Sequence, residues 1–198
     1  MALDSGCLVL TPVDPLDLPD RSEVRRVLAG AGLLAEPIPG RTHEPPGDAS
    51  GADVERFRVG PRLLELLIFA GCAVRIDTAP GDGAAFCHLR IPPPAPTPRL
   101  LAGRNTRPPR CPRCRVRLGD WRSHLSHWAD GHDLRVSCPA CAHAGPPWDW
   151  DWKQQGGFGR VFMMVEEVFP GEAVPTPALL DLLQDLGGRP WRHFYVQE

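Results

Sequence analysis

Apolar and polar positions recur at spacings that predict short strands and helices along most of the chain. The first apolar run, residues 7–10, predicts a short buried strand. Residues 20–23 then have the pattern of a capping box with Asp20 as the cap. Apolar residues at helical spacing follow this box, so we expect a first helix that ends near Gly30 or Gly32.

The middle of the N-terminal half predicts a loop, a second helix and a hairpin. Residues 35–53 are rich in proline and glycine and indicate a loop. Residues 60–69 open with Gly-Pro and are then apolar nearly all round, which is typical of a buried helix. Residues 74–91 alternate on either side of a Pro-Gly-Asp-Gly turn, as a hairpin does. Five prolines in residues 92–98 indicate a stiff linker.

The C-terminal part carries the clearest periodicity. Residues 156–159 are glycine-rich and predict a turn or bulge that leads into a strand. Residues 161–168 begin with apolar residues on both faces and indicate a central strand. Thr176-Pro177 is a helix cap followed by a first-turn proline, and a leucine stripe extends to Gly187. Residues 191–196 predict a closing strand.

Together these elements predict an α+β fold, with helices packed on a mixed or antiparallel sheet. Residues 1–98 and 148–198 are each too small for a convincing core of their own, so we expect them to build one core together. Residues 99–147 would then be an insertion into that core. The alternative is a chain of three separate units.

Charge is distributed unevenly along the chain. The net charge is −2, yet residues 99–144 carry nine arginines and only three acidic residues. Such a local excess attracts nucleic acid or an acidic protein face. No signal peptide and no apolar run long enough to span a membrane occur in the sequence. Seven cysteines, four of them at metal-binding spacing, indicate a reducing cytoplasm more than a disulfide framework.

Two Cys-Pro-x-Cys turns are the most specific chemical signal. Cys111 and Cys114 form the first pair, and Cys138 and Cys141 form the second, with 23 residues between the pairs. Each turn brings two thiolates to one ion, and two turns complete a tetrahedron, so we expect one structural Zn²⁺. The alternative is a pair of reduced redox-type turns, but these lack a supporting βαβ context.

This arrangement resembles the zinc-ribbon family, over residues 111–141 only. The resemblance implies that all four cysteines are ligands of a structural ion. Zinc ribbons often have glycine directly after the second cysteine of each turn, where the backbone is left-handed. Here Arg115 and Ala142 occupy those positions, which predicts turns that are less relaxed.

Arginines and tryptophans around the zinc segment form a candidate binding surface. One hypothesis is that bases stack on the indoles while arginines track phosphates; the other is a solvated arginine face over indoles that cover a small core. The candidate residues are Arg110, Arg113, Arg115, Arg117, Trp121, Arg122, Trp128, Trp148, Trp150 and Trp152.

Histidines and carboxylates offer further, weaker candidates. Four histidines lie in or beside the zinc segment, where they are surface residues or, alternatively, a second metal or pH-sensing site: His124, His127, His132 and His143. An enzyme would have to use Asp149, Asp151 or Glu166, and no catalytic motif surrounds them.

We therefore expect a cytoplasmic zinc-binding protein that acts as a protein–protein interaction or adaptor module. The alternative function is RNA or DNA binding through the arginine- and tryptophan-rich surface, with an enzyme third. The overall acidity of the chain and of both flanks of the zinc segment favours a protein partner.

Overall fold

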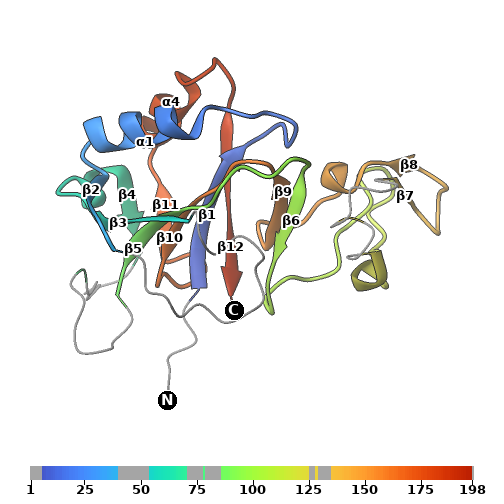
Figure 1. The fold of residues 1–198 in the computed structure, drawn as a ribbon. Coiled ribbons are helices and arrows are strands. Elements are labelled where there is room, and N and C mark those ends of the chain that lie inside the picture. The colour runs from blue at the N-terminus through green and yellow to red at the C-terminus, as the bar shows by residue number, and fades with distance from the viewer. Residues whose placement is uncertain are drawn as a thin grey trace.

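A six-stranded antiparallel sheet forms the body of the protein (Figure 1). This computed structural model describes residues 6–39, 54–70, 78, 86–124, 128 and 135–197. The strands of the sheet, in spatial order, are Trp191–Gln197 (β12), Gly6–Pro12 (β1), Met163–Glu166 (β10), His88–Ile91 (β5), Glu55–Val59 (β3) and Leu34–Pro37 (β2). Strands from both sides of the cysteine segment therefore share one sheet.

Both faces of β1 are buried, because its alternating side chains enter two different clusters. Leu8 and Leu10 lie in the larger core cluster, with side chains from the two longer helices. Cys7 and Val9 lie in a second cluster that includes Phe194 of β12. A strand covered on both sides reads as a continuous apolar run, which is the pattern of residues 7–10.

Helices α1 (Arg21–Gly30) and α4 (Pro177–Gln184) lie next to each other over one side of the sheet (Figure 1). Each begins at the predicted cap. The Asp20 carboxylate accepts a hydrogen bond from the Ser22 amide at 2.7 Å, and Thr176 Oγ1 accepts one from the Leu179 amide at 3.3 Å. The sequence predictions for these two helices and for strands β10 and β12 are confirmed.

The predicted α+β class with helices packed on a sheet is wrong, because the described chain is mostly β. It contains twelve strands in antiparallel sheets and three short helices, and 19% of it is helical. The largest error falls on residues 60–69. Only Leu63–Leu66 (α2) is helical, and Leu67–Phe69 (β4) is a strand paired with Ala173–Pro175 (β11).

The reason for this error lies in the sequence of residues 63–69. Periodicity cannot tell a buried helix from a strand when residues are apolar on every side. Pairing with β11, more than 100 residues later, selects the strand. The expectation of burial holds for Leu63, Leu66 and Leu67. It fails for Leu64, which is 70% exposed, and for Ile68, which is 57% exposed.

The glycine-rich residues 156–159 form a buried strand, β9 (Gly156–Gly159), where the sequence predicted a turn or bulge. It pairs with Arg99–Ala102 (β6) in a two-stranded ribbon beside β12 (Figure 1). A Cβ built on Gly157 would lie 2.7 Å from the Phe194 ring, so only glycine allows the ribbon to approach this closely.

The remaining elements are short. They are a 3₁₀ turn at Trp121–His124, strands Val136–Ser137 (β7) and Ala144–Gly145 (β8), and a 3₁₀ turn at Pro147–Asp149. The last turn covers the start of Trp148-Asp149-Trp150-Asp151-Trp152, which we call the Trp-Asp run. The second strand of the predicted hairpin is confirmed as β5, whereas residues 74–77 and 79–85 lie outside the described part of the chain.

In the ranges given above, no helix has the length and apolar character needed to cross a membrane.

We predict that Gly157→Ala destabilises the protein by about 1–3 kcal/mol, because the added methyl group overpacks the buried Phe194 ring. Urea denaturation followed by far-UV circular dichroism measures the change. Gly119→Ala is the matched control, since a Cβ there meets no atom within 4 Å. Equal stability of both variants would contradict the close approach of β9 to β12.

Candidate metal centre

The first cysteine loop, residues 110–117, is a tight hairpin whose end residues form an antiparallel bridge. The Cys111 amide donates to the Val116 carbonyl at 2.8 Å, and the Arg115 amide donates to the Cys111 carbonyl at 3.0 Å. These two bonds close the loop around the side chains of Cys111 and Cys114.

The second cysteine loop, residues 137–144, repeats this geometry 27 residues later. Its end residues pair within the β7–β8 hairpin. The Cys138 amide donates to the His143 carbonyl at 2.7 Å, and the Ala142 amide donates to the Cys138 carbonyl at 3.0 Å. The two loops are thus equivalent in backbone bonding, although apart from Cys-Pro-x-Cys their sequences differ.

The residue after each second cysteine adopts the left-handed conformation. Arg115 has φ of 65° and Ala142 has φ of 54°. These are the two positions where the sequence departs from the glycine that zinc ribbons often carry. Because a Cβ in this conformation costs roughly 1–2 kcal/mol, both loops are held against a local backbone penalty.

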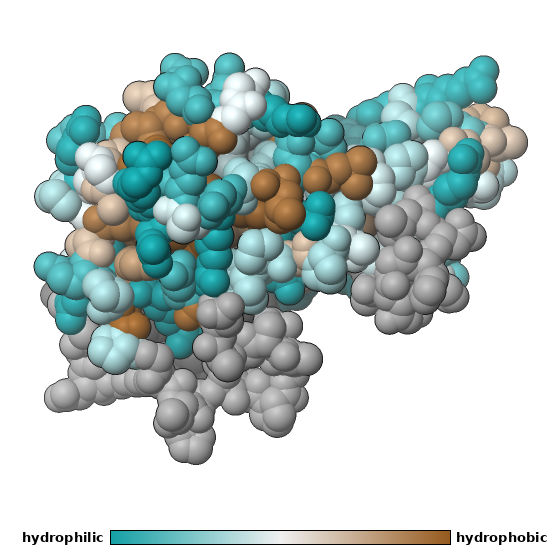
Figure 2. All heavy atoms as spheres, turned by 45° about the horizontal axis from the view of Figure 1, so that its top comes forward, coloured by the Kyte–Doolittle hydropathy of each residue, from teal (hydrophilic) through white to brown (hydrophobic). Residues whose placement is uncertain are grey.

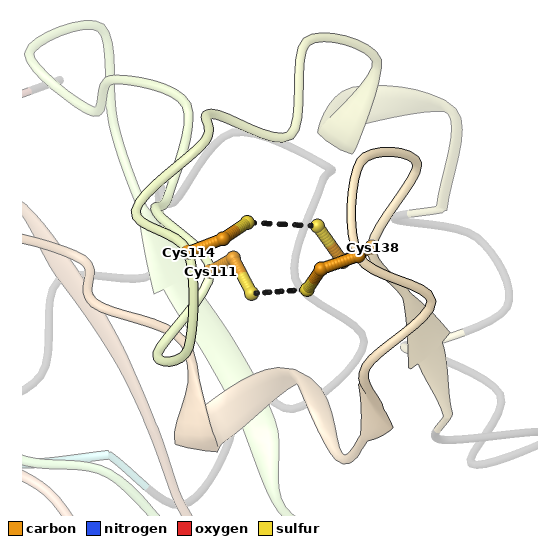
Figure 3. Close-up of side chains that lie close together, drawn as sticks. Cys111, Cys114 and Cys138 are labelled. Carbon is orange, nitrogen blue, oxygen red and sulfur yellow. Dashed lines mark hydrogen bonds between the residues drawn. The ribbon is translucent and has the colours of Figure 1, made fainter.

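The four sulfur atoms converge between the two loops. Every pair of Sγ atoms lies within 4.8 Å. Cys111 and Cys141 are 3.8 Å apart, Cys114 and Cys138 are 3.5 Å apart, and Figure 3 shows the pairs facing each other across a small gap. A tetrahedron with metal–sulfur bonds of about 2.3 Å has edges of about 3.8 Å. The cluster therefore has the size required for a four-thiolate metal ion, and these distances exceed the S–S bond of about 2.05 Å of a disulfide.

The loops also favour thiolate formation at the first cysteine of each turn. Burial raises the pKa of the Cys138 thiol, but the amides of Ala140 and Cys141 donate to its sulfur and bring the pKa down to about 6. The pKa of Cys111 is lowered in the same way: its burial is outweighed by the amides two and three residues on. Because metal ligands must be deprotonated, the lowered pKa values of Cys111 and Cys138 fit a metal site. At Cys114 the Val116 amide lowers the pKa, but burial and hydrogen bonds with the other three thiols raise it to about 12.

A cluster of aromatic rings packs beside the cysteine loops and contains five of the six tryptophans. At its centre is Phe158 of β9, whose ring centroid lies 5.7 Å from Trp128, 5.8 Å from Trp152 and 5.9 Å from Trp148. The buried members of this cluster are Cys111, Leu118, Trp121, Trp128, Val136, Cys138, Trp150, Trp152 and Phe158. We call this set the indole core. It joins the cysteine loops to the β6–β9 ribbon.

Asp151 forms a second link between the first loop and the Trp-Asp run. Its backbone pairs with Arg110, and its carboxylate forms ion pairs with Arg115 at 2.5 Å and Lys153 at 3.2 Å. Burial raises the pKa of Asp151, but the Lys153 amide and the Arg115 and Lys153 cations lower it by more. The carboxylate is therefore ionised at neutral pH and engaged in structure.

The structure divides the predicted binding-surface residues into two sets. The indoles of Trp121, Trp128, Trp150 and Trp152 are at most 4% exposed, and Trp148 is half-buried. Five of the predicted arginines lie within or just after the first cysteine loop. Arg113, Arg115, Arg117 and Arg122 are exposed and Arg110 is half-buried. The part of the chain that carries the cysteine loops projects to the right in Figure 2, and its coloured visible face is mostly hydrophilic.

The histidine and carboxylate candidates that the structure describes do not form a group placed to share a metal ion. His124 stacks on Trp128 with ring centroids 5.5 Å apart, and His127 and His132 lie outside the described residues. Within the described ranges, the four cysteines are the only group of three or more His, Cys, Asp or Glu side chains placed to share a metal ion. Glu166 is paired with Arg90 at 2.5 Å, and both side chains are largely buried.

Cys87 lies apart from the cysteine cluster. Its thiol is buried in the main core, and burial together with the nearby charges of Glu167, Glu166 and Glu172 raises its pKa to about 12. It therefore stays protonated, and its role is packing.

Sequence reasoning missed Phe158 and the aromatic contacts that surround it. A phenylalanine between glycines carries no signal for such a position.

No match was found when the sequence was compared with protein-family models and with curated proteins, or when the structure was compared with solved structures.

We predict that Ala142→Gly stabilises the second cysteine loop by up to about 1 kcal/mol, because glycine removes the left-handed penalty but adds freedom to the unfolded chain. Competition with a chelator measures this as tighter metal retention. Ala140→Gly is the control, since Ala140 is in the same loop and is not left-handed. Equal effects of the two substitutions would contradict the assigned strain.

Proposed function

We propose that this chain is a cytoplasmic, non-enzymatic interaction module in which one Zn²⁺, held by Cys111, Cys114, Cys138 and Cys141, organises an arginine-bearing surface. The convergence of four sulfurs from two equivalent loops carries the proposal. Zinc is the expected ion because four thiolates in a tetrahedral arrangement are a typical structural zinc site. The paired hairpins support the resemblance to a zinc ribbon.

A four-thiolate site supports a structural role for the ion. Four protein ligands fill a tetrahedral coordination sphere and leave no position for a substrate or an activated water. Binding free energy then becomes folding free energy for the two loops. Two of the three candidate carboxylates are also engaged, since Asp151 and Glu166 both pair with arginines. This favours an interaction protein over an enzyme.

Exposed arginines on the first cysteine loop support an acidic partner. In the described part of the chain no carboxylate pairs with Arg113 or Arg117, whereas Arg115 is already paired with Asp151. Arginine is enriched at the centres of protein interfaces, where it binds carboxylates in a bidentate manner. Burial of four indoles removes the stacking platform that the nucleic-acid alternative requires, so an acidic protein face is the better-supported partner.

We predict that Cys138→Ser abolishes zinc binding and unfolds residues 111–141, while the six-stranded sheet stays folded. Loss of one ligand removes most of the ion's contribution to the folding of loops whose own strands are only two residues long. Metal analysis of the purified protein measures zinc per chain, and near-UV circular dichroism reports on the indole core.

Cys87→Ala is the control for this experiment. Cys87 is as buried as Cys138 but lies in the main core, so its loss destabilises the sheet and leaves one zinc per chain. A Cys138→Ser protein with full zinc content would refute the ligand assignment.

We predict that the double charge reversal Arg113→Glu and Arg117→Glu weakens association with the native partner by at least about tenfold, or about 1.4 kcal/mol. Native lysate treated with nuclease supplies the partner in a pull-down, and titration of the recovered partner gives the affinity. Arg26→Glu on α1 is the control, since Arg26 is also highly exposed but lies on the sheet body.

Two results would overturn the proposed partner class. One is loss of the bound material on nuclease treatment, together with an affinity that falls steeply with salt, which identifies nucleic acid. The other is equal affinity of the double variant and the Arg26→Glu control.

A further inference from the structure

A pocket of about 300 Å³ lies between the end of the Trp-Asp run and strand β12. Trp150, Trp152, Lys153 and Gln154 contribute from one side, and Arg192 and His193 contribute from the strand. The pocket is separate from the cysteine cluster, and neither the zinc centre nor the arginines of the first loop explain its composition.

Cations outnumber anions in the lining of this pocket. Asp151 is its one carboxylate, and that group already pairs with Arg115 and with Lys153. Arg192 donates from Nη2 to the Phe158 carbonyl at 3.0 Å, and across the described ranges it has no carboxylate partner. Burial lowers the pKa of Arg192, yet an arginine remains charged at neutral pH. A half-buried cation without an anionic partner is a costly arrangement that a bound anion would relieve.

Two donors in the walls of the pocket also lack acceptors. Trp150 Nε1 and Arg192 Nε are both buried, and neither has a hydrogen-bond partner in the structure. An unsatisfied buried donor costs about 1–3 kcal/mol, and nearly all such groups in folded proteins find a partner. Neighbouring Trp152 shows the usual arrangement, since its Nε1 donates to the Pro147 carbonyl at 2.9 Å. Trp150 and Arg192 both line this pocket, so two of the unsatisfied buried atoms of the described residues belong to its walls.

The rim of the pocket is strained. Lys153 and Gln154 are consecutive non-glycine residues with φ of 54° and 55°. The Lys153 amide donates to Asp151 Oδ1 at 2.9 Å, and the Gln154 carbonyl accepts from the Tyr195 amide at 2.9 Å. These bonds hold the only lysine of the chain at the pocket. Backbone strain of this kind concentrates at ligand-binding sites.

We propose that this pocket binds a small oxyanion, with Arg192 and Lys153 supplying the charge and with Gln154 and His193 supplying further hydrogen bonds. The shared chemistry is a phosphate or carboxylate group, whose oxygens accept from several donors at once. The pocket is too small for more than a compact ligand or one terminal group of a larger one. The pocket lies outside the cysteine cluster, although Trp150 and Trp152 also belong to the indole core, and its test is separate.

The test is isothermal titration calorimetry of the zinc-loaded full chain with inorganic phosphate and, in a second arm, with acetate, at constant ionic strength. We expect saturable binding at one site per chain. Arg192→Gln weakens it by at least about tenfold, and Lys153→Gln, which keeps the rim backbone, weakens it severalfold. Arg113→Gln on the first cysteine loop is the control and leaves the affinity unchanged. Binding of phosphate alone assigns a phosphoryl ligand, and binding of both anions assigns a general oxyanion site.

Two results would overturn the proposal. The first is the absence of saturable binding of either anion at millimolar concentrations. The second is equal weakening by Arg113→Gln, which identifies general charge attraction. Because Arg192 also bonds the Phe158 carbonyl, zinc content and near-UV circular dichroism check the fold of Arg192→Gln. If that variant is misfolded, Lys153→Gln decides between the outcomes.

Discussion

The two cysteine loops bring four sulfur atoms within 4.8 Å of one another, close to the spacing of the ligands of one tetrahedral metal ion. The structure of this part of the molecule depends on that convergence. One loop is closed by a single bridge and the other by strands of two residues, and hairpins this short are at most marginally stable in water. Both loops also carry a non-glycine residue in the left-handed conformation. The indole core packs against both loops, and the four converging sulfurs are placed to share one metal ion.

The indole core transmits this stabilisation to the sheet. Phe158 of β9 contacts three indoles that pack beside the cysteine loops. The adjacent Gly157 packs against Phe194 of β12. Asp151 adds a polar link, since its backbone and carboxylate both engage the first cysteine loop. The first cysteine loop is therefore not a separate unit joined to the sheet only by a linker. The first cysteine loop and its arginines are connected to the main sheet through packed side chains.

The tryptophans of this region are mostly buried and its arginines are mostly exposed, and this difference follows from their chemistry. Indoles bury large apolar areas and exclude water from a small core, whereas guanidinium groups stay hydrated at the surface. The same separation leaves two positively charged features of different kinds. Arginines on the first loop are exposed to solvent. Arg192 and Lys153 line a partly open pocket.

The sequence alone determined the local features of this protein, and the tertiary structure decided the rest. Caps at Asp20 and Thr176 and the two cysteine turns were predictable, because caps and Cys-x-x-Cys turns depend on residues only a few positions apart. The mostly β class was not predictable, because residues 67–69 become a strand only through pairing with residues 173–175. Burial of the indoles and the close approach of Gly157 to Phe194 likewise arise from contacts between distant segments, which no local pattern records.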